Sequence, residues 1–183
     1  MSQRSLEARD AVARAKQPAA AFAAGVRFRF AGATDVPSLV PLINEAYTRE
    51  AHVLTGPRID EELLGEEMAE ETSRMIVAEV DGRLAGCVCL SVDGRGARFG
   101  LLAVDPRFQG NGLAPLLIGE AERRARARGQ EILRLDCAKE TGMPAYYTSL
   151  GYEVERETPD HLFQNRKVRK GPITLVKMMK RLR

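Results

Sequence analysis

The chain has 183 residues, of which 44% are apolar and 29% are charged, a balance typical of a folded globular protein rather than a disordered segment. No apolar run approaches the ~20 residues needed to cross a bilayer, so the sequence argues against a membrane-embedded protein. The net charge of +3, the absence of Trp and an aromatic content of 5% give no reason to expect a nucleic-acid partner.

Domain organisation and location follow from the chain ends and the cysteines. Residues 1–25 are interpreted as an N-terminal extension, flexible or helical, and residues 26–183 as one domain. The extension lacks the apolar core of a secretory signal. Cys87, Cys89 and Cys137 are odd in number and lie in apolar stretches, so we expect buried thiols, no disulfide framework and a cytoplasmic protein.

The first part of the domain predicts a strand followed by two helices. Residues 26–30 alternate apolar and basic side chains, as a half-buried strand does. Thr34 and Asp35 are candidate N-caps for a helix with a single apolar stripe. Asp60 is a candidate cap for an acidic second helix over residues 61–71.

Three closely spaced strands follow. Residues 75–80 and 84–92 are joined by Asp81 and Gly82, a strong hairpin signal because both residue types tolerate a positive φ. The strand over 84–92 is almost entirely apolar and is therefore expected to be buried on both faces. A third strand is predicted over 97–104.

The rest of the chain predicts a long helix, a strand, a short helix and two closing strands. These elements cover a helix from Leu113, a strand over 132–137, a helix over 144–150, and strands over 152–157 and 173–178. The order β-α-α-β-β-β-α-β-α-β-β predicts an α/β (α+β) fold. Its sheet is mixed and mostly antiparallel, with six or seven strands and helices on both faces. The strands on either side of the long helix should be parallel.

The sharpest local feature is a glycine-containing loop between the strand ending at Val104 and the helix starting at Leu113. Gly110 and Gly112 allow a ligand to approach the backbone closely, and successive N–H groups at a helix N-terminus attract anions. The loop is therefore a candidate cradle for a diphosphate. From spacing alone, a tight connection that binds no ligand is the alternative.

Two other phosphate-binding motifs fit the loop poorly. The P-loop pattern G-x-x-x-x-G-K-[ST] is absent. A dinucleotide fingerprint would match Gly110, Gly112 and an acid at Asp136, but Pro115 occupies its third small position. The chain also offers one strand–helix–strand unit where that fold uses several.

The loop and its surroundings resemble a known family. Gln109, Gly112 and Ala114 match the [Q/R]-x-x-G-x-[G/A] motif of the GNAT N-acetyltransferases. Residues 100–106 are similar to the strand that precedes this motif, and residues 146–152 resemble a second signature, an aromatic-Tyr-x-x-x-Gly-aromatic stretch. The resemblance implies the fold of that family, acetyl-CoA as co-substrate, no metal, and an amine-bearing acceptor.

The resemblance, which covers roughly residues 26 to 180, also implies roles for single residues. Tyr147 corresponds to the general acid that protonates the departing CoA thiolate. The strand backbone would pair with the pantetheine arm where two parallel strands splay, the loop amides would hold the diphosphate, and the Val104 N–H would face the developing oxyanion. The implied acetyl-CoA contacts are Leu102, Ala103, Val104, Gln109, Gly110, Asn111, Gly112, Leu113, Ala114 and Tyr147.

The sequence leaves the general base unassigned. An amine with a pKa near 10 must lose a proton before it attacks a thioester. Many members of the family carry a carboxylate on the strand before the loop, but residues 97–102 contain none, and Glu140 stands where the family often has Asn. Asp136 and Glu79 are the candidate bases, and each is also explained as a structural carboxylate.

Other candidate groups surround these positions. Glu50 and His52 lie in the loop after the first helix, which faces the acceptor in the family, although both would also suit a plain surface. Arg107, Arg123 and Arg124 are candidates for the CoA 3′-phosphate, with exposure to water as the alternative.

Two functional hypotheses follow from the sequence. The first is an acetyl-CoA-dependent N-acetyltransferase in which a primary amine attacks directly within a ternary complex. The second is a non-catalytic acyl-CoA-binding or regulatory module on the same fold. The acceptor is open: the acidic helix over 61–71 would suit a cationic amine, but helix solubility explains its charges equally well. A homodimer is compatible with the family, and the basic run over 166–170 is interpreted as a solvated loop.

Overall fold

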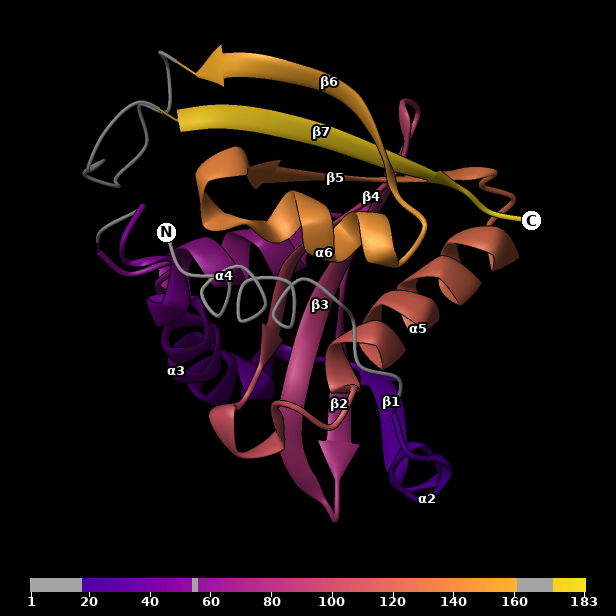
Figure 1. Cartoon of the computed structure of the whole chain (residues 1–183). Helices are drawn as coiled ribbons and strands as arrows, with labels where there is room; N and C mark the ends of the chain where they lie inside the picture. The colour runs from indigo at the N-terminus through magenta and orange to yellow at the C-terminus, as the bar shows by residue number, and fades with distance from the viewer. Residues whose placement is uncertain (1–17, 54–55, 161–172) are drawn as a thin grey trace, which may run out of the picture.

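Seven strands form a single sheet in the computed structural model, which describes residues 18–53, 56–160 and 173–183 (Figure 1). The strands are β1 (Val26–Phe30), β2 (Ser73–Val80), β3 (Arg83–Asp93), β4 (Gly96–Val104), β5 (Ile132–Ala138), β6 (Glu153–Asp160) and β7 (Ile173–Arg181). The helices are α2 (Ala20–Ala24), α3 (Val36–Ala46), α4 (Glu61–Ala69), α5 (Leu113–Ala127) and α6 (Met143–Ser149). None of the helices described is both long and apolar enough to cross a membrane.

The strand order confirms the sheet predicted from the sequence. It runs β1-β2-β3-β4-β5-β7-β6. Among the described strands, β4 and β5 are the parallel pair and every other neighbouring pair is antiparallel. The helix α5 connects the two parallel strands, as expected. Within the N-terminal extension, α2 is helical, and residues 1–17 lie outside the described residues.

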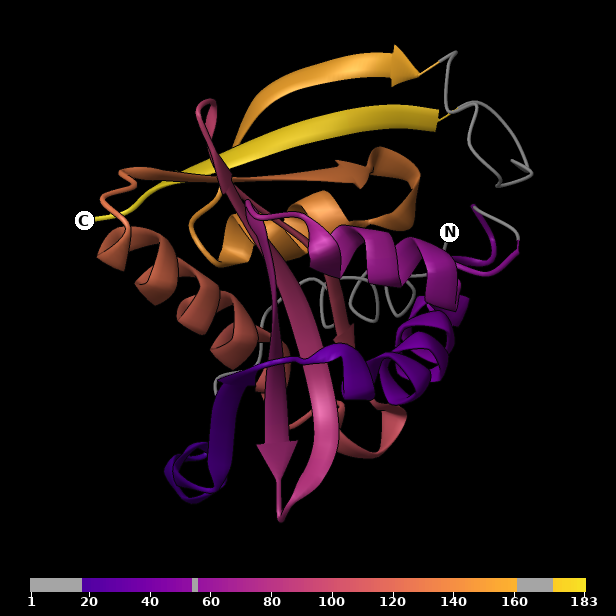
Figure 2. The ribbon, with the colours of Figure 1, turned by 180° about the vertical axis from the view of Figure 1, so that it is seen from behind.

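Helices cover the two faces of the sheet, as Figures 1 and 2 show from opposite sides. On one face α5 and α6 pack on the sheet, with Leu117 and Tyr147 in the same buried cluster as Phe99. On the other face α3 and α4 bury Leu39 and Leu64 in a second cluster. The expectation of helices on both faces is therefore confirmed.

The cysteines behave as the sequence predicts. Cys87 and Cys89 are fully or almost fully buried and share the cluster under α3 and α4. Burial raises the pKa of Cys89 to about 12, so this thiol stays protonated at neutral pH. Cys137 is half-buried and packs against the opposite cluster.

Local turn chemistry agrees with the sequence at one position and departs from it at another. Asp81 and Gly82 adopt φ values of 50° and 72°, the left-handed pair of the predicted hairpin turn. Asp35 stands at the N-cap of α3, yet its carboxylate makes no capping bond to that helix. It accepts two hydrogen bonds of 2.8 Å from Arg29 and one from the Gly32 N–H. The charge-assisted bonds to the guanidinium replace the cap.

Gly86 allows β3 to approach the end of β4 closely. A Cβ at this position would lie 2.7 Å from the Ala103 carbonyl oxygen and 3.0 Å from Leu117 Cδ1. We expect Gly86→Ala to destabilise the protein by about 1–3 kcal/mol through overpacking. Gly119→Ala, at an exposed position of α5 with nothing within 4 Å, should instead stabilise it by about 0.5–1 kcal/mol. Urea unfolding of the two variants checks this difference in sign.

Candidate functional site

The parallel strands β4 and β5 diverge toward the glycine loop. Their register contains two pairs, Ala97 with Leu133 and Arg98 with Arg134. No further pair joins the described strands between Arg98 and the end of β4. The second half of β4 therefore leaves backbone groups on its β5 side without a strand partner. This is the splay that the family resemblance implies.

A β-bulge in β4 lies within the divergent stretch. Cys87 pairs with Ala103 and Cys89 pairs with Gly100, so Leu101 and Leu102 together oppose one residue of β3. Leu101 has a φ of 47°, a left-handed conformation that costs a side-chain-bearing residue about 1–2 kcal/mol. The sequence predicts a regular strand here, and no Gly or Asn at position 101 signals the bulge. Such stored strain is concentrated at functional sites.

The glycine loop presents backbone N–H groups at the N-terminus of α5. Gly110 and Gly112 both have positive φ values, 77° and 81°, which the loop geometry requires. Among the described residues, the N–H groups of positions 110–114 donate to no backbone acceptor, and the first bond into the helix runs from the Leu116 N–H to the Gly112 carbonyl. These amides and the positive end of the helix dipole fit a diphosphate.

Side chains of the loop hold its shape. The Gln109 Nε2 donates to the Val104 carbonyl oxygen at 2.8 Å, which ties the loop to the end of β4. The Asp105 carboxylate accepts from the Arg107 N–H at 2.8 Å and from its guanidinium at 2.7 and 3.0 Å. The Arg107 side chain lowers the pKa of Asp105, so this pair is ionised at neutral pH. The loop is therefore set in place before any ligand arrives.

Tyr147 connects the two divergent strands. Its ring meets Phe99 of β4 edge-on, with the ring centroids 5.9 Å apart, and it also packs edge-on against Tyr146 and Tyr152. The residue is 7% exposed, and its hydroxyl makes no hydrogen bond to the residues described. Burial, followed by the nearby Tyr47, Cys137, Tyr146 and Glu50, raises the pKa of Tyr147 well above its ordinary value. The hydroxyl therefore keeps its proton at neutral pH.

Side chains from the segments that follow α3 lie near Tyr147. Glu50 ends the 3-10 turn Tyr47–Glu50 that follows α3, and its charge contributes to the raised pKa values of Tyr47, Cys137 and Tyr147. The Arg58 guanidinium lies 4.6 Å from the centre of the Tyr47 ring. Glu50 and the Tyr47–Arg58 pair thus lie near Tyr147, which packs against Phe99 of β4.

Asn44 fixes this arrangement to α3. Its Oδ1 accepts from the N–H groups of Arg58 and Ile59 at 2.6 and 3.0 Å, and its Nδ2 donates to the Ile59 carbonyl at 2.8 Å. The segment around Arg58 and Ile59 is therefore held against α3, whose C-terminal end leads into Tyr47.

The carboxylates named from the sequence as candidate bases are engaged in ion pairs. Glu79 accepts from the Arg29 Nε at 2.8 Å on the β1–β2 side of the sheet. Asp136 is exposed on β5 and lies 3.6 Å from the Arg98 guanidinium. Glu140, at the family's Asn position, accepts from the Thr174 N–H at 2.9 Å and so anchors the start of β7.

The other candidates are placed as follows. His52 is exposed, and its Nδ1 lies 3.0 Å from the Arg49 carbonyl oxygen. Arg123 and Arg124 of α5 both bind Glu120, at 2.8 and 2.6 Å. The Arg124 guanidinium also lies 4.0 Å from the centre of the Phe30 ring. The basic run over 166–170 lies outside the described residues.

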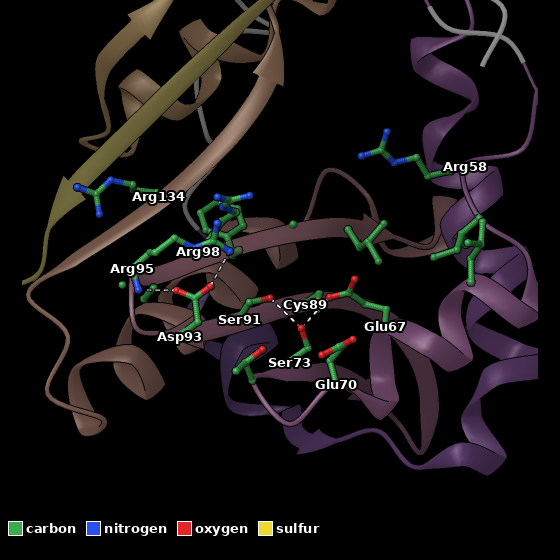
Figure 3. Close-up of a pocket in the computed structure, with 18 residues that line it drawn as sticks. Arg58, Glu67, Glu70, Ser73, Cys89, Ser91, Asp93, Arg95, Arg98 and Arg134 are labelled. Atoms are coloured by element: carbon green, nitrogen blue, oxygen red, sulfur yellow. Dashed lines mark hydrogen bonds and ion pairs between the residues drawn. The ribbon is translucent and has the colours of Figure 1, made fainter. Parts of the chain in front are cut away.

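A cavity of about 590 Å³ opens on the face of β4 that α4 borders (Figure 3). Leu101 and Arg58 line it at the end near Tyr47. Glu67 lines it from α4, with its Oε1 accepting from Ser73 at 2.7 Å and from the Cys89 thiol at 3.4 Å. The cavity begins beside the divergent strands and is therefore the candidate pocket for a second substrate.

Comparison with known families identifies this architecture. The model of the acetyltransferase (GNAT) domain matches residues 43–182, more than half of the chain. The chain belongs to the GNAT acetyltransferase family. The predicted family, fold and enzyme class are thereby confirmed.

Solved structures of other acetyltransferases share the fold. The ribosomal-protein-S18-alanine N-acetyltransferase of Escherichia coli superposes with a TM-score of 0.66 at 20% identity, covering 86% of this chain and 94% of that one. The putative acetyltransferase yncA of Salmonella typhimurium, solved with acetyl-CoA, superposes with a TM-score of 0.67 at 22% identity, covering 86% of this chain and 94% of that one. The spermidine N-acetyltransferase of Vibrio cholerae, solved with CoA and spermine, superposes with a TM-score of 0.68 at 20% identity, covering 87% of this chain and 96% of that one.

Sequence reasoning about this GNAT acetyltransferase missed several residues of the site. The bulge at Leu101 and the Arg58–Tyr47 contact depend on residues far apart in the sequence. Glu67, by contrast, belongs to the acidic segment 61–71 that the sequence offered for a cationic amine. The Tyr146 hydroxyl is buried without a hydrogen-bond partner among the described residues. The spacing of residues 146–152 identifies the aromatic stretch, but it cannot show that the Tyr146 hydroxyl is buried without a partner.

Proposed function

We propose that the protein transfers the acetyl group of acetyl-CoA to a primary amine by direct attack within a ternary complex. The observation that carries the proposal is the position of Tyr147, which contacts β4 and lies close to Cys137 of β5 where these strands diverge. A protonated hydroxyl beside this opening, together with the N–H cradle at the start of α5, suits acyl transfer from a CoA thioester.

The donor side is formed mainly by backbone. Acetyl-CoA supplies an activated acyl thioester when bound. In the proposal, backbone groups of Leu102 and Val104 on the β5 side of β4 pair with the amides of the pantetheine arm, and Ala103 lies between them. The N–H groups of positions 110–114 hold the diphosphate. The Val104 N–H faces the negative charge that develops on the carbonyl oxygen.

The acceptor side needs a base, and we propose Glu50. Glu50 is half-buried, and its charge adds to burial in raising the pKa of both Tyr47 and Tyr147, which places its carboxylate near the two hydroxyls. Glu50 takes the ammonium proton, directly or through one water, and Tyr147 gives its proton to the departing thiolate. Proximity of the two substrates in one opening supplies much of the rate.

The base assignment predicts a pH-dependent defect. Near pH 7 an amine with a pKa of about 10 is almost entirely protonated, so Glu50→Gln should lower kcat/KM about 100-fold. Near pH 10 about half of the amine is already neutral, so the defect should shrink. The measurement is thiol release from acetyl-CoA across this range, run in parallel on Asp136→Asn and Glu79→Gln. A wild-type rate for Glu50→Gln at pH 7 removes Glu50 from the mechanism, and the variant that alone shows the pH-dependent defect identifies the base.

A non-catalytic acyl-CoA-binding module is the second candidate, because β4 lacks the carboxylate that many family members carry there. The two functions differ in thiol release. If acetyl-CoA binds but no amine in a broad panel releases CoA thiol, the module is favoured.

We further propose that residues 26–183 form one acetyltransferase domain that works in the cytoplasm without a metal. The family match over 43–182 and the three unpaired cysteines support this arrangement. Contacts of Arg107, Arg123 or Arg124 with the CoA 3′-phosphate also stay a proposal.

A further inference from the structure

The charges around the 590 Å³ cavity are divided along its length (Figure 3). Arg95, Arg98 and Arg134 gather at the end near the β3–β4 turn, and Arg58 lies at the opposite end. Glu67 and Glu70 lie between these ends. The end near Arg58 is the one beside Tyr47 and the opening between the strands, so the arginine cluster lies at the end distant from the reaction.

The three clustered arginines keep hydrogen-bond donors available. Arg95 binds Asp93 at 3.1 Å, Arg134 binds Glu155 at 3.3 Å, and Arg98 lies 3.6 Å from Asp136, beyond a good hydrogen bond. Arg134 uses its Nε and Nη2 on Glu155 at 3.3 Å, and Arg95 uses its Nη2 on Asp93. A guanidinium has five N–H donors, so at least three remain available on each of these arginines. Exposed pairs of this kind are also weak.

A second cavity, of about 400 Å³, adjoins the first and contains the same three arginines. It adds Arg156 and Lys177, for which no ion pair is found among the described residues. Counted over both cavities at this end, five cationic side chains face three carboxylates, those of Asp93, Asp136 and Glu155. The excess positive charge lies on the open face of β4, β5, β6 and β7.

We propose that Arg98 and Arg134 form an anion subsite that selects an acceptor carrying a carboxylate or phosphate at some distance from its reactive amine. This proposal rests on the acetyl-transfer function and names the acceptor class. An amine at the Leu101 end would lie beside Tyr47 and within reach of the Glu67 carboxylate. An anion at the other end would meet two guanidinium groups that can bind it bidentately.

The spacing sets the length of the acceptor. Arg98 precedes Leu101 by three residues, roughly 10 Å along the strand. An α-amino acid is too short to join the two ends, whereas an extended ω-amino acid or the N-terminus of an acidic peptide fits. A polyamine would place a second cation against the arginines and is disfavoured.

Three matched acceptors test the proposal. They are 6-aminohexanoate, 6-aminohexanamide and 1,6-diaminohexane, which share a chain and differ in the charge of the far end. We expect kcat/KM for the carboxylate to exceed that for the amide roughly ten- to hundredfold, with the diamine lowest. The ratio of kcat/KM for 6-aminohexyl phosphate to that for 6-aminohexanol measures the effect of a phosphate. Comparing it with the carboxylate-to-amide ratio shows which anion is preferred.

Variants assign the effect to the arginines. The double variant Arg98→Gln/Arg134→Gln should lose the preference for 6-aminohexanoate while the rate with 6-aminohexanamide and the affinity for acetyl-CoA stay unchanged. Arg98→Lys/Arg134→Lys should restore part of the preference, since charge is kept and bidentate geometry is lost. Arg27→Gln, which removes an exposed cation from the distant edge strand β1, is the matched control.

Several results would overturn the proposal. Equal rates for the three acceptors, a preference for the diamine, or a double variant that keeps the carboxylate preference each exclude the subsite, while acetyl transfer stands. A double variant that loses all three activities equally also excludes it. If no acceptor releases thiol, acetyl transfer fails instead. Calorimetric binding of 6-aminohexanoate to the wild-type protein with CoA, lost in the double variant, then decides the subsite independently.

Discussion

Tyr147→Phe is expected to lower kcat about 100-fold while leaving the affinity for acetyl-CoA unchanged. The substitution removes the hydroxyl and keeps the ring that packs edge-on against Phe99, Tyr146 and Tyr152. No hydrogen bond joins the Tyr147 hydroxyl to a described residue, so its loss leaves no described partner unsatisfied. Steady-state thiol release and calorimetric titration with acetyl-CoA measure the two quantities.

Tyr152→Phe is the matched control from the same aromatic cluster. The Tyr152 hydroxyl donates to Glu122 at 3.0 Å, so this variant should lose about 1 kcal/mol of stability and keep its turnover. The raised pKa of Tyr147 adds a second expectation: the hydroxyl stays protonated above pH 9, so the wild-type rate should not fall below that pH through this group. Equal kcat for wild type and Tyr147→Phe would remove Tyr147 from the proton transfer.

Elements with strong local signals could be predicted from the sequence alone. The hairpin at Asp81 and Gly82, the cap at Asp60 and the start of α5 at Leu113 each depend on neighbouring residues, and the structure places them as expected. The loop before α5 was recognisable because glycine spacing and helix polarity are local properties too.

The parts that were missed depend on pairing between distant segments. Leu101 adopts a left-handed conformation because one residue of β3 must oppose two of β4, and nothing in its own sequence neighbourhood reveals that register. Asp35 binds Arg29 instead of capping α3 because folding brings a guanidinium close to it. The grouping of Arg98 with Arg134 follows from the short parallel pairing of β4 and β5. The residues proposed to bind the acceptor are therefore brought together only by tertiary folding.

Gly112→Val is expected to raise the Kd for acetyl-CoA more than 100-fold, because Gly112 is buried, has a φ of 81° and is the N-cap residue of α5 within the N–H cradle. A β-branched side chain resists this conformation and would occupy the space where the backbone must meet a diphosphate. Ligand-induced stabilisation measures the effect: acetyl-CoA at 100 times the wild-type Kd should stabilise the wild type by about 2.7 kcal/mol and the variant by almost nothing.

Gly129→Val separates loss of the cradle from backbone strain. Gly129 has a φ of 74° at the opposite end of the same helix, is exposed and has nothing within 4 Å of an added Cβ. Both variants therefore bear a left-handed valine, and each should lose about 1–3 kcal/mol of stability without ligand. Gly129→Val should retain the full stabilisation by acetyl-CoA because the N–H groups of positions 110–114 are untouched. If the two variants bind acetyl-CoA equally well, the cradle at the start of α5 does not hold the diphosphate.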